Sequence, residues 1–401
     1  MTSTRPEREF PLEAVASIVD EVARENYGGG VPDSRDEFSG GLELHELIDD
    51  LTSPTDDDIA SALKTELEKQ DNYWPPDGEE AFYSEEYVYN RIEVGTDNYG
   101  RFWDEFQKLL MHEQRFFSRN AFELLALIFK DVEQQTDKNR RSPVYMIEPG
   151  GGQHAFYRAR IIRDPSETKK FRENVADQLG PPPDRMRTPG RLNPSGISAF
   201  YGAFDLDTSV AELRPSVGTR VALAQFQIKK PICVLDTTRF SGKPKANNMF
   251  KPGALQIAAQ WNFMRSFMRQ ISKPVKPGEE HLDYIPTQAV AEYLAYHHEM
   301  KIDGKTRKVD AIIYASAQND GEGKNIAILG PASVTGELDE NGKRKIKKSE
   351  NEFFDLFPSF LVPSPEIRIT PVADSFVVHE VSAVKFATSQ HYSTYEWLDD
   401  D

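Results

Sequence analysis

The spacing of hydrophobic residues separates a helical first third from a remainder rich in short strands. Between residues 99 and 135, apolar residues recur every three or four positions from Phe102 to Leu110 and again from Ala121 to Val132. The polar and aromatic stretch Arg115 to Ser118 interrupts this period. Apolar residues at this spacing form one face of an amphipathic helix. The pattern therefore predicts a helical hairpin or a small helical bundle.

The hydrophobic pattern before residue 99 is weaker. Residues 12–22 predict one short helix that gives way to Gly28-Gly29-Gly30, and we interpret it as a tethered helix at most. The pattern of residues 42–70 predicts helical structure rich in acidic residues. Residues Thr55 to Asp58 are predicted to start a helix, where the helix dipole favours their carboxylates. We interpret these acids as a solvated face rather than a metal or partner site.

Beyond residue 153, short apolar runs alternate with two helical stretches. The helices are predicted at 254–268 and 286–300. Strands are predicted at 156–162, 199–204, 221–228, 232–235, 311–314, 326–329 and 376–386. Strands mixed with few helices in this way predict an α+β domain built on a split antiparallel sheet.

Polar and glycine-rich stretches set the predicted domain boundaries. A helical domain is expected over 1–140, a linker over 141–153, the α+β domain over 154–390 with an insert at about 331–370, and an acidic tail over 391–401. Within the insert, Glu340 to Lys343 predicts a hairpin, and 343–348 is a basic run expected at a solvated strand edge. Gly150-Gly151-Gly152 lacks the spacing of a phosphate-binding loop, so a flexible linker is favoured.

Charge and cysteine content narrow the classes of function. With 48 Lys and Arg against 65 Asp and Glu, the net charge of -17 argues against binding to nucleic acid or anionic membranes, although a local arginine pocket can still hold a small anion. No apolar run reaches the length of a membrane span, so we expect a cytoplasmic protein. The single Cys233 lies in an apolar run and is expected to be a buried structural residue.

Two histidine-containing segments are candidates for metal binding. His112-Glu113 and His297-His298-Glu299 lack HExxH spacing, and neighbouring histidines on a helix point about 100 degrees apart. We therefore expect no metal.

A dispersed set of polar residues carries the strongest functional signal. Its members, in chain order, are Tyr157, Arg158, Arg191, Tyr201, Glu212, Ser316 and Asn325. They occur in the segments Phe156-Tyr157-Arg158-Ala159-Arg160, Gly190-Arg191-Leu192-Asn193-Pro194, Ala199-Phe200-Tyr201-Gly202, Ser209-Val210-Ala211-Glu212-Leu213, Tyr314-Ala315-Ser316 and Asn325-Ile326-Ala327-Ile328-Leu329. In their order and settings these segments resemble the RES domain, over about residues 152–386.

The resemblance implies a fold akin to the mono-ADP-ribosyltransferases and an activity that splits NAD at the nicotinamide-ribose bond. It assigns Arg158, Glu212 and Ser316 to catalysis. It assigns NAD binding to Arg158 and Arg191, and we expect Tyr157, Tyr201 and Asn325 to contribute to the same binding site. It also implies a bacterial toxin or defence effector held by an antitoxin or immunity partner, and a homo-oligomer is a further expectation.

The chemistry suits these residue types, but each has a structural alternative. Arginine binds phosphate oxygens in pairs, and a carboxylate can stabilise the positive charge that develops on the ribose. A strand arginine can instead simply pair with an acid, and Ser209 with Glu212 has the spacing of a capping box. Tyr201 suits core packing, and Ser316 suits a turn.

Three readings of function remain open at this level. The first is an NAD glycohydrolase or phosphorylase, the second an ADP-ribosyltransferase acting on a protein or small molecule, and the third a non-catalytic interaction protein. The helices of 102–132 look like the HEPN-related domain found before some RES domains. Its nuclease members need an arginine followed closely by a histidine, which this region lacks, so packing or regulation is expected there.

Overall fold

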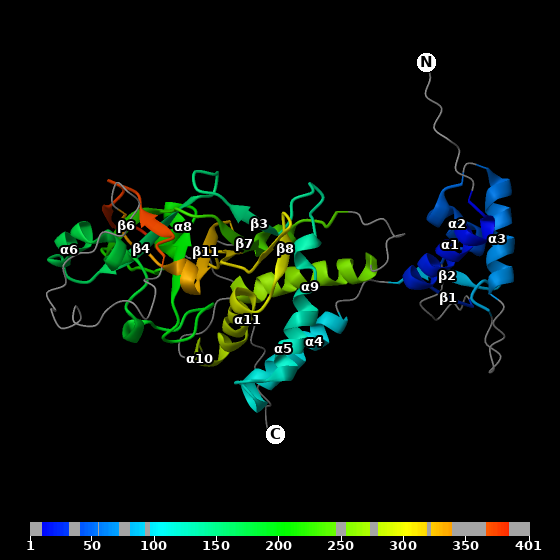
Figure 1. Ribbon diagram of the computed structural model, residues 1–401, viewed down its shortest axis with the longest axis horizontal. Coiled ribbons are helices and arrows are strands. Elements are labelled where there is room, and N and C mark those ends of the chain that lie inside the picture. Colours follow the sequence, from blue (N-terminus) through cyan, green and yellow to red (C-terminus); the bar gives the residue numbers. More distant parts are fainter. Residues whose placement is uncertain are drawn as a thin grey trace, which may run out of the picture. The chain divides into compact units, whose positions relative to one another are not determined.

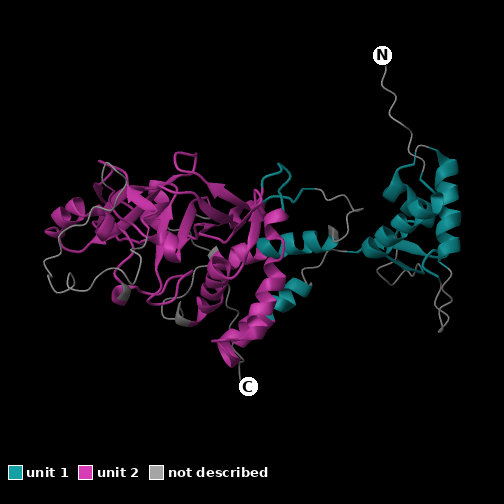
Figure 2. Cartoon of the chain, in the orientation of Figure 1, with its two compact units in different colours: residues 1–104, 135–141, 242–265 teal, residues 105–134, 142–241, 266–401 magenta. Residues whose placement is uncertain are grey.

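The computed structural model describes residues 10–31, 41–54, 56–71, 81–92, 97–245, 254–272, 280–318, 322–338 and 366–384. The chain forms two compact units (Figure 2). The first contains residues 1–104, 135–141 and 242–265, and the second contains 105–134, 142–241 and 266–401. The segment 105–134, predicted as part of the N-terminal domain, therefore belongs to the second unit.

The first unit contains a small helical core. Its helices are α1 (Leu12–Asn26), α2 (Leu44–Thr52) and α3 (Asp57–Gln70), and its strands β1 (Tyr27–Gly30) and β2 (Val88–Arg91) pair antiparallel. The carboxylate of Asp56 accepts a hydrogen bond from the amide of Asp58, so α3 begins within the predicted start.

The expectation of a tethered first helix was wrong. One face of α1 is buried with apolar residues from α2 and α3 in a single cluster. That cluster includes Ala16, Val19, Val22, Leu47, Ile48, Leu51, Leu63 and Leu67. The glycines after α1 belong to β1, because they pair with β2, which lies at least 58 residues further along the chain. The local sequence pattern gives no sign of such a long-range contact.

The helical pattern of 99–135 is confirmed. It forms α4 (Asp97–Lys108), the π-helical turn η1 (Leu109–Glu113), α5 (Arg119–Phe129) and the 3-10 turn η2 (Val132–Gln134). The break falls where predicted, and the hydroxyl of Ser118 caps α5 by accepting from the amide of Ala121 at 3.3 Å. The resemblance of this region to HEPN domains stays a prediction.

A nine-stranded sheet organises the second unit (Figure 1). Its order is β12-β6-β4-β5-β11-β10-β7-β3, and β13 also pairs with β6. The strands are β3 (Val144–Ile147), β4 (Ala155–Ile162), β5 (Ala199–Ala203), β6 (Arg220–Ile228), β7 (Ile232–Asp236), β10 (Ala311–Ala315), β11 (Lys324–Leu329), β12 (Ile369–Pro371) and β13 (Val377–Glu380). The sheet is mixed rather than antiparallel as predicted, because β7 and β10 run parallel.

The sheet is split between β4 and β5. Along β4 and β6, eight residue pairs join the strands, from Ala155 with Gln227 to Ile162 with Arg220. Between β4 and β5, Tyr157 with Ala203 is the one pair across these described strands. The two strands therefore diverge and leave space between them.

Short helices and a hairpin complete the unit. The helices are α6 (Glu167–Glu173), α7 (Val175–Leu179), η3 (Asp184–Met186), α8 (Leu206–Ala211), η4 (Thr237–Ser241), α10 (Glu280–Asp283), α11 (Ile285–Tyr296) and η5 (Gly330–Ser333), and α9 (Ala254–Ser272) extends across both units. The hairpin joins β8 (Met300–Ile302) to β9 (Lys305–Arg307). The helix predicted at 286–300 ends at Tyr296, because the amides of His297 and His298 both donate to the carbonyl of Tyr293.

Two predicted boundaries differ from the structure. The predicted linker 141–153 contains β3, whose short apolar run pairs with β7. The predicted insert 331–370 contains η5 and β12, while the hairpin at 340–343, the basic run 343–348 and the tail 391–401 lie outside the described residues. Of the strand predicted at 376–386, the structure has Val377–Glu380, and residues 385 and 386 are not described.

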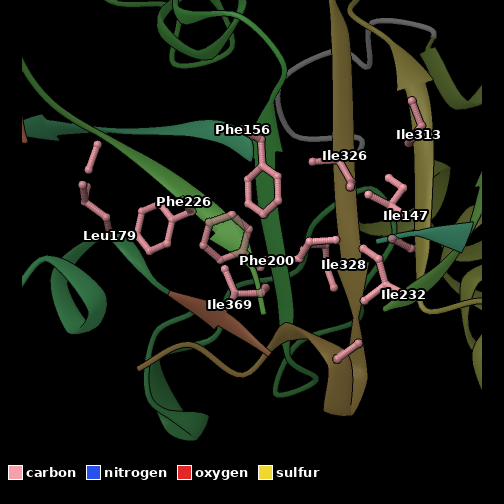
Figure 3. Close-up of a cluster of buried hydrophobic side chains, with 14 of the residues drawn as sticks. Ile147, Phe156, Leu179, Phe200, Phe226, Ile232, Ile313, Ile326, Ile328 and Ile369 are labelled. Carbon is pink, nitrogen blue, oxygen red and sulfur yellow. The ribbon is translucent and has the colours of Figure 1, made fainter. Parts of the chain in front are cut away.

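Apolar residues cover both faces of the sheet. On one face, the rings of Phe156, Phe200 and Phe226 pack edge to face at centroid distances of 5.4 and 5.0 Å, beside isoleucines from β10 and β11 (Figure 3). On the other face, a cluster around Val221 and Leu223 receives apolar residues of α8 and its flanks. The position of α8 beside the split places its C-terminal end at the space between β4 and β5.

Candidate active site

A pocket of about 330 Å³ lies at the split in the sheet. Its walls come from β4, β5, β10, β11, the end of α8 and the turn around Arg191, all within the second unit. The lining residues are Arg158, Ala159, Gly190, Arg191, Tyr201, Gly202, Ala203, Ser209, Glu212, Leu213, Arg214, Tyr284, Tyr314, Gln318 and Asn325.

Arg158 occupies the space between the diverging strands. Its Nη1 donates to the carbonyl oxygen of Tyr201 at 2.6 Å, and the guanidinium lies 5.7 Å from the centroid of the Phe200 ring. Its buried Nε has no hydrogen-bond partner, and the guanidinium forms no ion pair among the described residues. Burial, and less strongly the neighbouring Arg160, lowers its pKa to about 10, so it remains charged at neutral pH. A buried cation without a counter-ion is costly, and an anion in the pocket would offset that cost.

Arg191 lies on a turn fastened by Tyr201. The Tyr201 hydroxyl donates to Oδ1 of Asn193 at 2.7 Å and accepts from the amide of Leu192 at 3.0 Å. A Cβ atom on Gly190 would come within 2.6 Å of both the Tyr201 hydroxyl and Asn193 Oδ1, so this position needs glycine. Tyr201 therefore acts on the turn through its hydroxyl, and it is also one of the residues that line the pocket.

Glu212 follows the last residue of α8 and lines the same pocket as the two arginines. Its Oε1 accepts hydrogen bonds from Ser316 Oγ at 2.6 Å and from Asn325 Nδ2 at 2.7 Å. Ser316, which follows β10, and Asn325 of β11 are buried, whereas Glu212 is exposed at the pocket. The Ser316 hydroxyl also accepts from the amide of Gln318 at 3.2 Å. These bonds fix one carboxylate oxygen and leave the other for a ligand.

The capping-box interpretation of Ser209 and Glu212 was wrong. The helix begins earlier than that reading assumed, and Asp205 is its N-cap, accepting from the amide and hydroxyl of Thr208 at 2.7 Å each. Ser209 lies inside α8, and Glu212 follows its last residue. Glu212 therefore has no role at the start of the helix.

The sequence-predicted residues are brought together with one exception. Arg158, Arg191, Tyr201, Glu212 and Asn325 line the pocket, and Ser316 touches it through Glu212. Tyr157 pairs with Ala203 in the sheet and is not among the lining residues.

Sequence reasoning missed several residues of the pocket wall, among them Tyr314, Tyr284 and Arg214. Tyr314 is paired with Asn325 across β10 and β11, so both side chains lie on one face. Burial, followed by the nearby Tyr201 and Glu212, raises the pKa of Tyr314 well above its usual value, so its hydroxyl stays protonated. Tyr314 lies two residues before Ser316, and residues two apart along a strand share a face of the sheet. The predicted position of Ser316 could therefore have indicated Tyr314 as a pocket residue. The sequence contains no comparable signal for Tyr284 or Arg214, because each lies outside the strands that carry the other residues.

The cysteine and the histidine considered for nucleophilic or metal chemistry do not line this pocket. Cys233 is fully buried in β7, and burial raises its pKa to about 12, which makes the thiol inert at neutral pH. His298 is packed against Tyr293 and Phe129 at centroid distances of 5.5 and 6.4 Å. Among the described residues there is no group of three His, Cys, Asp or Glu side chains placed to hold a metal ion. Within the same residues, no helix has the length and apolar character needed to cross a membrane.

Comparison with known proteins supports the resemblance found in the sequence. Residues 157–343 match the family model of the RES domain, a stretch that includes every wall of the pocket. No curated protein matches the chain. From Tyr157 to Lys343, this chain carries a RES domain.

Proposed function

We propose that this protein consumes NAD by cleaving the bond between nicotinamide and ribose. One observation carries the proposal: an arginine that forms no ion pair among the described residues, and whose Nε is buried, lines the same pocket as an oriented carboxylate. The substrate has both complementary features, a pyrophosphate anion and a sugar that becomes positively charged during cleavage. The RES domain is consistent with an enzyme that uses NAD.

Arg158 and Arg191 would bind the pyrophosphate. The planar guanidinium group matches pairs of phosphate oxygens, and the Tyr201 carbonyl and the Arg191 turn hold the two arginines before the substrate arrives. Pre-ordered cations need little rearrangement when the anion binds.

Glu212 would act on the ribose. As the bond from ribose C1′ to the nicotinamide nitrogen breaks, its electron pair leaves with nicotinamide, and positive charge spreads over C1′ and the ring oxygen. The free carboxylate oxygen of Glu212 would accept from a ribose hydroxyl and stabilise that charge, while Ser316 and Asn325 hold the other oxygen. Water, phosphate or another acceptor then adds to C1′.

Product analysis tests the proposal. The purified protein is incubated with NAD, with and without phosphate, and the products are separated and identified. Free ADP-ribose would indicate a glycohydrolase, ADP-ribose-1-phosphate a phosphorylase, and labelled protein or small molecule a transferase. If nicotinamide is not released under any condition, cleavage of this bond is refuted.

A role as a toxin or defence effector follows from the same proposal, because unrestrained NAD consumption would harm the producing cell. Such a protein would require an antitoxin or immunity partner. Induced expression should arrest growth and deplete cellular NAD, and Glu212→Gln should remove both effects. Growth arrest by the Glu212→Gln variant equal to that of the wild type would refute this role.

A further inference from the structure

Helix α11 holds the turn that carries Arg191. The carbonyl oxygens of this turn point toward the first residues of the helix. The hydroxyl of Thr287 donates to the carbonyl of Arg191 at 2.6 Å, with a longer contact of 3.1 Å to the carbonyl of Tyr284. The side-chain amide of Gln288 donates to the carbonyls of Gly190 at 2.7 Å and Asn193 at 3.1 Å. Three carbonyls within four residues are therefore bound by two consecutive side chains.

The opposite side of the same turn is bound as well. The amide of Leu192 donates to the Tyr201 hydroxyl, and the amide of Gly190 donates to the carbonyl of Asn193 at 2.9 Å. Asn193 is itself 5 % exposed and donates to the carbonyl of Ile197 at 3.0 Å. The backbone of this turn is therefore held by hydrogen bonds on two sides.

Tyr284, which immediately precedes α11, completes the support. The guanidinium of Arg191 lies 5.4 Å from the centroid of the Tyr284 ring, a distance at which a cation and an aromatic face attract one another. The backbone of Arg191 and its charged end are thus both placed by the start of one helix.

We propose that Thr287 and Gln288 are positioning residues, which set the affinity of the pocket for the anionic part of its substrate by fixing Arg191. This inference rests on the proposed function, in which Arg191 binds a pyrophosphate. A loosened turn would have to be ordered again when the anion binds, so the cost falls on binding. The carboxylate that acts on the ribose comes from another wall of the pocket, so chemistry on bound substrate would be preserved.

The closing experiment compares Thr287→Val with Thr287→Ser. Valine keeps the shape of threonine without its hydroxyl, whereas serine keeps the hydroxyl that reaches Arg191. We expect Thr287→Val to raise the KM for NAD about fivefold to tenfold, the effect of losing one neutral hydrogen bond. We expect kcat to stay within about twofold, because uniform binding is lost rather than transition-state stabilisation. Gln288→Leu should act in the same direction, and Thr287→Ser should remain near the wild type.

Two further measurements separate this inference from the proposed function. One is the affinity for ADP-ribose, which carries the pyrophosphate but not the bond to be cleaved, by calorimetry. The other is amide hydrogen exchange in peptides covering 188–197. Thr287→Val should weaken ADP-ribose binding and speed exchange in this segment, with the melting temperature nearly unchanged.

The possible results decide between the two proposals. If the wild type binds ADP-ribose but does not cleave NAD, the proposed function fails while the positioning role is still tested by affinity and exchange. Equal affinity and exchange in Thr287→Val and wild type would overturn the positioning role. It would also be overturned if Thr287→Ser were as impaired as Thr287→Val, or if kcat fell while KM stayed constant.

Discussion

Replacing Glu212 with glutamine should remove most NAD turnover while leaving the fold nearly intact. The amide oxygen of glutamine can accept the same two hydrogen bonds, from Ser316 and Asn325, that Glu212 Oε1 accepts now. What changes is the charge, because the second oxygen becomes an uncharged amide group. The substitution therefore separates electrostatic stabilisation of the ribose from support of the pocket.

The size of the effect follows from the charge that is lost. Two unit charges about 4 Å apart interact by about 4 kcal/mol at an effective dielectric constant of about 20. Removal of one oriented electrostatic partner commonly costs about 2.7 to 4 kcal/mol, or roughly a hundredfold to a thousandfold in kcat. The stability change should be smaller, because a hydrogen bond to a charged group contributes about 1.5–3 kcal/mol and a neutral one about 0.5–1.5 kcal/mol.

Glu212→Ala should behave differently from Glu212→Gln in stability. Alanine leaves the buried Ser316 hydroxyl and Asn325 amide without their acceptor, at a cost of about 1–3 kcal/mol for each unpaired group. Nicotinamide release and melting temperature are measured for both variants and for Glu292→Gln. Glu292 is an exposed residue of α11 outside this pocket, and its variant should match the wild type in both measurements. A Glu212→Gln protein with wild-type turnover would refute the electrostatic role.

Three other substitutions or treatments test the pocket and the core. Arg158→Met should raise the KM for NAD at least about tenfold. The melting temperature should change little, because loss of the hydrogen bond to the Tyr201 carbonyl is offset by removal of a cation that forms no ion pair among the described residues. An unchanged KM would remove Arg158 from the site. Arg214 lines the pocket and has a left-handed backbone (φ 47°), a conformation that asparagine tolerates. Arg214→Asn should therefore leave thermal stability unchanged and weaken NAD binding several-fold. Equal NAD affinity of variant and wild type by calorimetry would show that this arginine does not contact substrate. Because its pKa is raised to about 12, the Cys233 thiol stays protonated in the folded protein at pH 8, so mass spectrometry should find it alkylated by iodoacetamide only in denaturant; rapid modification of the native protein would contradict its burial.

The sequence predicted the elements of the second unit better than their pairing. The strands around Arg158, Tyr201 and Ser316 were located from apolar runs, and the RES resemblance is confirmed by the family match. The mixed character of the sheet was missed because the parallel pairing of β7 with β10 joins residues 77 positions apart in the chain. The sequence predicts a linker where β3 lies, because four apolar residues between polar stretches give too short a signal for a strand.

The site could be predicted in composition but not in its supports. Residue type and order pointed to Arg158 and Glu212, whereas the role of Thr287 and Gln288 depends on a turn almost 100 residues earlier in the chain. Local spacing was misleading at Ser209, since the helix start there is decided by the hydrogen bonds of Asp205. Spacing reports which residues share an element, but it does not report which carbonyl a distant side chain will bind.

The split between β4 and β5 ties the shape of the pocket to one side chain. Where the strands separate, Nη1 of Arg158 donates to the Tyr201 carbonyl, taking the place that a neighbouring strand amide would have in a continuous sheet. Arg158 therefore provides a hydrogen-bond donor for the Tyr201 carbonyl while its side chain lies between the two strands. If Arg158 were lost, the Tyr201 carbonyl would lack this donor at the point where the two strands separate. One side chain therefore supports both the backbone at the opening in the sheet and the positive charge of the cavity that lies there.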